Sequence, residues 1–133
     1  MADQLQFDMV SPERLLKSEP VASVTVPGAD GYFTVLVNHA PFMTTLKPGV
    51  VDIVSDAGRE RFYVRGGFAD VGATGLTILA EEAIPLAEVD PQALAEDIQN
   101  CREDVADAPD PEAKAIAETR LNDLLDVQKA LGR

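Results

Sequence analysis

The sequence contains no tryptophan, one histidine (His39) and one cysteine (Cys101) among its 133 residues. A single cysteine cannot form an intramolecular disulfide, so a secreted disulfide scaffold is excluded and a reducing compartment is expected. One histidine and one cysteine cannot supply the ligands of a tetrahedral nitrogen and sulfur metal site, and no nucleophile and base motif accompanies either residue. We therefore expect no catalytic residue, no metal site and no cofactor.

Basic residues are also scarce, since 11 Lys and Arg stand against 23 Asp and Glu and the formal net charge is -12. Proteins that bind phosphate backbones need basic patches, so nucleic acid is not an expected partner. No apolar run approaches the roughly 18 residues of a membrane span, and the first residues lack the basic and apolar pattern of a signal peptide. The sequence predicts a cytoplasmic protein without membrane insertion of its own.

Glycine and aromatic residues almost disappear from the last third of the chain. Eight of the nine glycines lie at or before Gly75, and all aromatic residues lie at or before Phe68. The chain length suits a small domain with an appendage too thin for a core of its own. We therefore predict two parts, an N-terminal domain over 1–86 and a C-terminal appendage over 87–133.

Residues 1–86 alternate short β-rich runs with turn residues. Expected strands cover 5–10, 22–26, 31–37, 49–55, 60–65, 68–71 and 76–79. Short strands at even spacing indicate a sandwich or barrel. The glycine-containing segment 27–31 lacks the ending of a phosphate loop and is interpreted as a turn. The Gly66-Gly67-Phe68 segment predicts a bulge or a close backbone approach, with a partner contact as the alternative.

Residues from Asp90 onward change to a helical period. Asp90-Pro91 and Asp110-Pro111 are both helix start signals, with a capping carboxylate followed by proline at the first helical position. Apolar stripes follow each signal, first Leu94, Ile98, Cys101 and Val105, then Ala117, Leu121, Leu124 and Leu131. The short interruption between the two helices predicts an antiparallel hairpin.

Three segments, in this order, resemble the epsilon subunit of bacterial F-type ATP synthases. They are 24–31 (Val-Thr-Val-Pro-Gly-Ala-Asp-Gly), 38–49 (Asn-His-Ala-Pro-Phe-Met-Thr-Thr-Leu-Lys-Pro-Gly) and 64–68 (Val-Arg-Gly-Gly-Phe). The closing segment 79–83 (Leu-Ala-Glu-Glu-Ala) and the helical hairpin after it also fit, so the resemblance covers essentially the whole chain. It implies a β-sandwich of about ten short strands followed by the antiparallel α-helical hairpin.

The resemblance further implies a non-catalytic rotor subunit in the central stalk, which couples proton-driven ring rotation to ATP synthesis. The implied partners are the gamma subunit and the proteolipid c-ring, with the alpha and beta subunits reached through the C-terminal helices. The implied location is the cytoplasmic face of the inner membrane, as a peripheral part of the synthase. Asp30, Tyr32 and His39 match the family region that faces the ring, and Gly66, Gly67 and Phe68 are further contact candidates.

In similar proteins the hairpin is mobile and can extend along gamma to restrain ATP hydrolysis. Basic residues usually support that extension, and the candidates here are Lys114, Arg120, Lys129 and Arg133. Some relatives bind ATP through an Ile/Leu-Asp-x-x-Arg-Ala motif, but Ala93 stands at the arginine position of this chain. Without that cation a polyphosphate loses its bidentate partner, so weak or no ATP binding is expected.

Two other functions are compatible with the residues alone. One is a free-standing sandwich that binds a basic partner through its acidic hairpin, which, unlike a stalk subunit, does not need gamma. The other is a small hydrolase or isomerase that uses His39 with a carboxylate, which a His39→Ala substitution would test.

Overall fold

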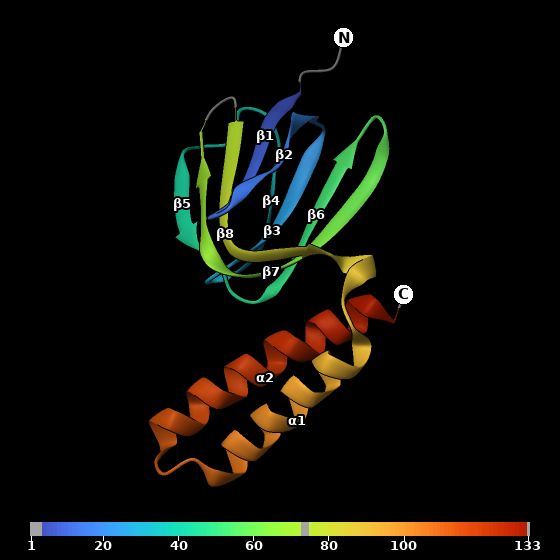
Figure 1. Ribbon diagram of the computed structural model, residues 1–133. Coiled ribbons are helices and arrows are strands. Elements are labelled where there is room, and N and C mark those ends of the chain that lie inside the picture. The colour runs from blue at the N-terminus through green and yellow to red at the C-terminus, as the bar shows by residue number, and fades with distance from the viewer. Residues whose placement is uncertain (1–3, 73–74, 133) are drawn as a thin grey trace.

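The computed structural model describes residues 4–72 and 75–132 of the chain. They form eight strands, one short 3-10 helix and two α-helices (Figure 1). The strands are β1 (Leu5–Ser11), β2 (Arg14–Val21), β3 (Ser23–Gly28), β4 (Gly31–Val35), β5 (Phe42–Thr45), β6 (Gly49–Ser55), β7 (Gly58–Val71) and β8 (Gly75–Pro85). The helices are η1 (Leu86–Glu88), α1 (Pro91–Asp107) and α2 (Pro111–Leu131).

All eight strands belong to one hydrogen-bonded sheet that folds over itself into a sandwich (Figure 1). Its path runs β2-β1-β8-β7-β6-β3-β4, and β5 also pairs with β7. β7 enters both layers, because residues 58–64 pair with β6 while residues 68–71 pair with β5. We call β2, β1, the first half of β8, the second half of β7 and β5 the first layer. The second layer contains the remaining halves of β8 and β7, with β6, β3 and β4.

The number of strands is smaller than the about ten that the resemblance implied, while the sandwich and hairpin are confirmed. The sequence pattern predicts separate strands on either side of Gly66-Gly67. In the structure β7 continues through both glycines and keeps one antiparallel register with β8 from Phe62 to Val71, although the register pairs pass over Gly66. Both glycines have positive φ, 72° and 107°, so they bend one long strand from one layer into the other.

The sandwich core lies between the two layers and is built by alternating residues. Leu5, Phe7 and Met9 of β1 are fully buried, as the alternating pattern of that segment predicted. Valines of β3, β4, β6 and β7 meet them from the other strands. The buried cluster consists of Leu5, Phe7, Met9, Val21, Val24, Val26, Val35, Leu46, Val51, Ile53, Phe62, Val64, Ala69, Val71, Leu76, Ile78 and Ala80.

β2 is a strand that the sequence pattern does not predict. It carries the charged residues Arg14, Lys17 and Glu19 and includes Pro20, which removes a backbone donor. The sheet path places β2 at its edge, where proline and charge are tolerated and discourage pairing with other chains. Because β2 lies at the edge of the sheet, apolar and polar residues alternate only weakly along it. The sequence pattern therefore gives little indication of a strand.

The two helices begin where the sequence predicted. Asp90 Oδ1 accepts a hydrogen bond from the Gln92 backbone N–H at 2.9 Å, and Asp110 Oδ1 accepts one from Ala113 at 2.8 Å. Each carboxylate therefore caps amides that lack a partner inside the helix. The helices lie side by side as a hairpin beneath the sandwich (Figure 1).

Candidate functional site

The hairpin packs on the outer face of the second layer through a second hydrophobic cluster. From the sandwich it contains Val50 of β6 and Tyr63 of β7. The other buried members belong to η1, the segment that follows it, and the helices, and they are Leu86, Val89, Leu94, Ile98, Cys101, Leu124 and Val127. We call this contact between hairpin and sandwich the seam. The narrow apolar stripes of the two helices predict that the hairpin packs on another surface, either the sandwich or a partner, and the structure shows it on the sandwich. The individual residues of the seam were not predicted, because its two sides are far apart in sequence.

One ion pair crosses the seam within the part of the chain that the structure describes. Lys47 Nζ, from the loop between β5 and β6, lies 3.5 Å from Asp123 Oδ1 on α2. The same ammonium lies 5.1 Å from the centre of the Tyr32 ring, within the range of a cation–π contact. The Tyr32 hydroxyl in turn accepts a hydrogen bond from the backbone N–H of Val50 at 3.1 Å. These contacts connect β4, β6 and α2.

Burial perturbs the titration of the seam residues. Desolvation raises the pKa of Asp123, the neighbouring Asp126 raises it further, and Lys47 opposes the rise. Desolvation also raises the pKa of the Tyr32 phenol, although that side chain is still 42% exposed. The Asp123 carboxylate is the one charged side chain that is buried among the described residues. The seam therefore holds a charge that burial disfavours.

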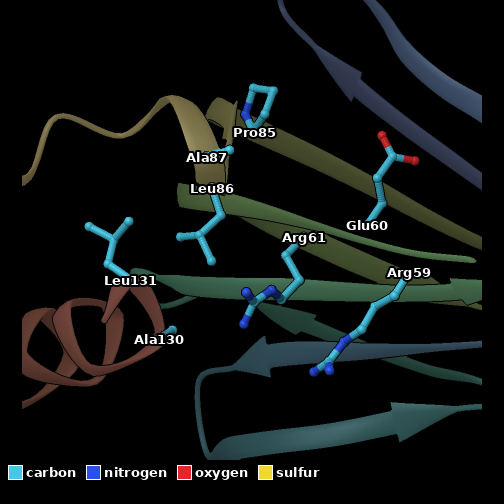
Figure 2. Close-up of a pocket in the computed structure, with 8 residues that line it drawn as sticks. All are labelled: Arg59, Glu60, Arg61, Pro85, Leu86, Ala87, Ala130 and Leu131. Carbon is cyan, nitrogen blue, oxygen red and sulfur yellow. The ribbon is translucent and has the colours of Figure 1, made fainter. Parts of the chain in front are cut away.

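A groove of about 440 Å³ opens at the end of the seam, where α2 finishes beside β7 and η1 (Figure 2). The sandwich contributes Arg59 and Arg61 and the hairpin contributes Ala130 and Leu131. The Nε of Arg59 donates to both carboxylate oxygens of Asp52, at 2.9 and 3.1 Å. The local charges are thus partly balanced, and the groove shows no concentration of unpaired cations that would bind an anion.

The β3–β4 turn and the loop after β4 form an exposed edge of the sandwich. Asp30 is exposed in the turn, next to Gly31, whose φ of 133° confirms the predicted turn. The rings of Phe33 and His39 lie 6.4 Å apart, and Phe33 meets Phe42 edge-on at 5.3 Å. We call Asp30, Phe33, His39 and Phe42 the loop edge.

His39 makes a local contact at this edge. Its Nδ1 lies 2.7 Å from the carbonyl oxygen of Ala40, so the ring donates to its own loop. No described carboxylate forms a hydrogen bond or ion pair with the imidazole. Tyr32, which was expected beside Asp30 and His39, places its hydroxyl against Val50 at the seam.

A row of apolar side chains crosses the outer face of the first layer. Leu15, Val10, Leu79 and Phe68 are register partners on the neighbouring strands β2, β1, β8 and β7. Three of them are exposed, Leu15 by 59% and Leu79 and Phe68 by 37% each. We call these four residues the apolar row. Only Phe68 was a contact candidate, because the row becomes visible only when the strand registers are known.

Gly66 and Gly67 serve the fold at the bend of β7. A Cβ at Gly67 would overlap the carbonyl oxygen of Leu79, and one at Gly66 would overlap the Glu81 carboxylate. The backbone of β8 therefore approaches β7 closely at this point. Of the bulge and the close backbone approach that the sequence predicts here, the structure shows the close approach. A register shift, which would mark a bulge, is absent between β7 and β8 over the described pairs.

The basic candidates of α2 point away from the sandwich core. Lys114, Arg120 and Lys129 are exposed and form no ion pair with any described residue. Arg133 lies outside the described residues. Ala93 is exposed in the first turn of α1, where the side chain of Asp90 is already engaged in capping Gln92.

Residues 4–86 match the model of the ATP synthase delta/epsilon chain beta-sandwich domain. The chain belongs to this family. It is 49% identical to the ATP synthase epsilon chain of Mesorhizobium japonicum over 132 residues, which cover 98% of both chains. It is 52% identical to the epsilon chain of Maricaulis maris over 114 residues, or 86% of each chain.

The delta/epsilon fold extends to a distant solved relative. A chain in the mitochondrial ATP synthase structure of Euglena gracilis, which contains OSCP, F1 and the c-ring, superposes with a TM-score of 0.81 at 27% identity. The match covers 98% of this chain and 83% of that one. The family relationship therefore includes the helical hairpin as well as the sandwich. Among the described residues, no helix is long and apolar enough to cross a membrane.

Proposed function

We propose that this protein is the non-catalytic central-stalk subunit of an F-type ATP synthase, coupling proton-driven rotation of the c-ring to ATP synthesis. The observation that carries the proposal is the relationship to ATP synthase epsilon chains over nearly the whole length of both chains. The protein acts through its surfaces, as a peripheral subunit on the cytoplasmic face of the inner membrane.

The apolar row is our candidate for the gamma-binding face. Permanent subunit interfaces are more apolar than the remaining surface, and solvent-exposed leucine and phenylalanine side chains on one flat sheet face suit such a contact. Met43 on β5, which is 62% exposed, faces the same side, because its register partner Asp70 alternates with Phe68 on β7. The seam and the hairpin lie on the opposite layer and leave this face open.

The loop edge is our candidate for the contact with polar loops of the c-ring. Asp30 offers a carboxylate, and His39 offers the Nε2 of an imidazole whose Nδ1 already bonds within its loop. Phe33 packs edge-on against Phe42 within this edge. Tyr32 belongs to the seam, so its substitution should affect the hairpin more than the ring.

Replacement of Phe68 by lysine tests the gamma-binding face. A charged side chain in the apolar row should be desolvated on assembly, so we expect F68K to reduce co-purification of the protein with gamma by at least about tenfold. Co-purification from cells that express the whole synthase measures the effect. Val54→Lys is the matched control, because Val54 is 40% exposed on β6 in the other layer.

Thermal unfolding of the isolated variants separates lost binding from lost folding. The proposal for this face is contradicted if F68K assembles as well as the parent, or if V54K is lost from the complex to the same extent. Failure of the unaltered protein to purify with gamma at all would contradict the stalk function itself.

A further inference from the structure

Carboxylates border the apolar row on both sides. Asp8 of β1 and Asp70 of β7 are register partners of Thr77 on β8, which lies two positions before Leu79. Because residues two apart in a strand share a face, both aspartates lie on the same outer face as the row. Glu81 lies two positions beyond Leu79; both are exposed, and the residue between them is buried. We call Asp8, Asp70 and Glu81 the acidic border.

The acidic border is not neutralised within the part of the chain that the structure describes. The carboxylates of Asp70 and Glu81 are exposed and form no ion pair with any described residue. Asp8 accepts hydrogen bonds from Ser18 Oγ at 2.6 Å and from Gln6 Nε2 at 3.3 Å, but neither donor carries a charge. All three carboxylates therefore keep their charge, and two of them are open to a partner.

Basic side chains are absent from this face over the described strands. Lys17 of β2 reaches across to the second layer, where its Nζ lies 2.6 Å from Glu60. Arg65 of β7 forms an ion pair with its register partner on β8. Arg14 directly precedes Leu15, so strand alternation directs it to the opposite side of β2. The outer face of the first layer thus combines exposed apolar side chains with charges of one sign.

This combination restricts the partner that the face can bind. A second copy of the chain does not complement it, because both copies bring carboxylates and neither brings a cation. A complementary surface has an apolar ridge with Lys or Arg side chains on both sides of it. Since the apolar row is our candidate for the gamma-binding face, gamma is the partner on which we expect these basic side chains.

We propose that the acidic border pairs with basic side chains of gamma and sets the rate and orientation of docking, a role that rests on the proposed gamma-binding face. Charges at the rim of an interface act mainly on association, whereas buried apolar contacts act mainly on dissociation. The border is asymmetric, with Asp8 and Asp70 on one side of the row and Glu81 on the other. A gamma surface docked in the reverse orientation would therefore leave charges unpaired.

Neutralisation of the two open carboxylates tests this role in the full-length protein. The immobilised protein binds the gamma-containing catalytic complex of the same organism, prepared without this subunit, and biolayer interferometry measures both rate constants. We expect Asp70→Asn combined with Glu81→Gln to slow association about tenfold at about 20 mM salt and to leave dissociation nearly unchanged. At about 500 mM salt, screening should remove the difference.

Asp104→Asn combined with Glu118→Gln is the matched control, because it removes the same types and number of charges from exposed positions on the hairpin. An equal slowing in this control, unchanged association of the D70N/E81Q variant, or a difference that persists at high salt would overturn the proposal. Self-association of the isolated protein through this face, lost in F68K, would assign the face to a second copy instead. Absence of any binding by the unaltered protein would contradict the gamma-binding face itself.

Discussion

Gly67 occupies a backbone position where other residue types are strained and a side chain would also displace β8. Its φ is 107°, and a Cβ would overlap the Leu79 carbonyl oxygen. Gly31 has a similar φ of 133° but no atom within 4 Å of an added Cβ. A substitution at Gly31 therefore introduces backbone strain alone, whereas one at Gly67 introduces both backbone strain and a steric overlap with β8.

Alanine substitutions at the two glycines test this distinction. We expect G31A to lower the free energy of unfolding by about 1–2 kcal/mol through strain alone. G67A should lower it by about 3 kcal/mol or more, because β8 must also shift. Urea unfolding followed by circular dichroism measures both values. Equal losses would mean that the approach of β8 to Gly67 does not constrain this position.

At the residue scale, sequence predicts types of position better than contacts. Gly66-Gly67 was identified as a special backbone segment because glycine pairs within β-rich runs are unusual. The buried Tyr63 hydroxyl, which has no hydrogen-bond partner among the described residues, could not be foreseen, since it depends on which residues of the hairpin cover it. The same holds for Leu15 and Leu79, which form a row with Phe68 only through strand register.

At the level of elements, α2 brings a buried carboxylate to the seam. Several groups face Asp123: Lys47 from the β5–β6 loop, the Tyr32 ring from β4, and Asp126 and Arg120 on α2 itself. Desolvation is the largest effect on Asp123 and raises its pKa in the docked hairpin. A raised pKa means that the docked form binds the proton more tightly than the separated form.

Docking should therefore strengthen as pH falls from the raised pKa of Asp123 toward the ordinary value of an aspartate, and weaken as pH rises through the same range. Tyrosine fluorescence can follow this change, because the protein has no tryptophan and both tyrosines lie at the seam. Asp123→Asn removes the titrating group, and we expect it to abolish the change in docking above the ordinary pKa of an aspartate. Persistence of an equal change in D123N would assign it to other groups.

The elements differ in how well sequence predicts them. Both α-helices begin at their predicted Asp-Pro signals, because capping and proline geometry are local. β2 and β5 were missed as strands, and β7 was divided in two. Strand boundaries depend on partners distant in sequence, and an edge strand such as β2 needs no strong alternation.

For the whole molecule, both proposed contact surfaces lie on the sandwich, and this predicts the effect of removing the hairpin. The apolar row and the loop edge both belong to the sandwich. The hairpin packs on the other layer through the seam and contacts neither of these two surfaces. A chain that ends at Val89 should therefore assemble and support coupled proton pumping in the reconstituted synthase. Loss of pumping, with the sandwich still folded by circular dichroism, would contradict this assignment.

The same preparation tests the role of the hairpin. ATP hydrolysis above that of the full-length protein, with pumping preserved, would identify the hairpin as an inhibitory element that acts through α2. An unchanged rate would leave coupling as the function of the protein and would count against Lys114, Arg120 and Lys129 as inhibitory contacts.

The parallel pairing of β1 with β8 also affects the order of events during synthesis. β1 can pair locally with β2 as soon as both emerge from the ribosome, but its other neighbour is made only after β3 to β7. The core cannot close until β8 is released, because Leu76 and Ile78 belong to it. Contacts between such distant segments form slowly. The seam needs α2, the last element to be made, as well as β6 and β7, so it can form only after all the strands have been synthesised.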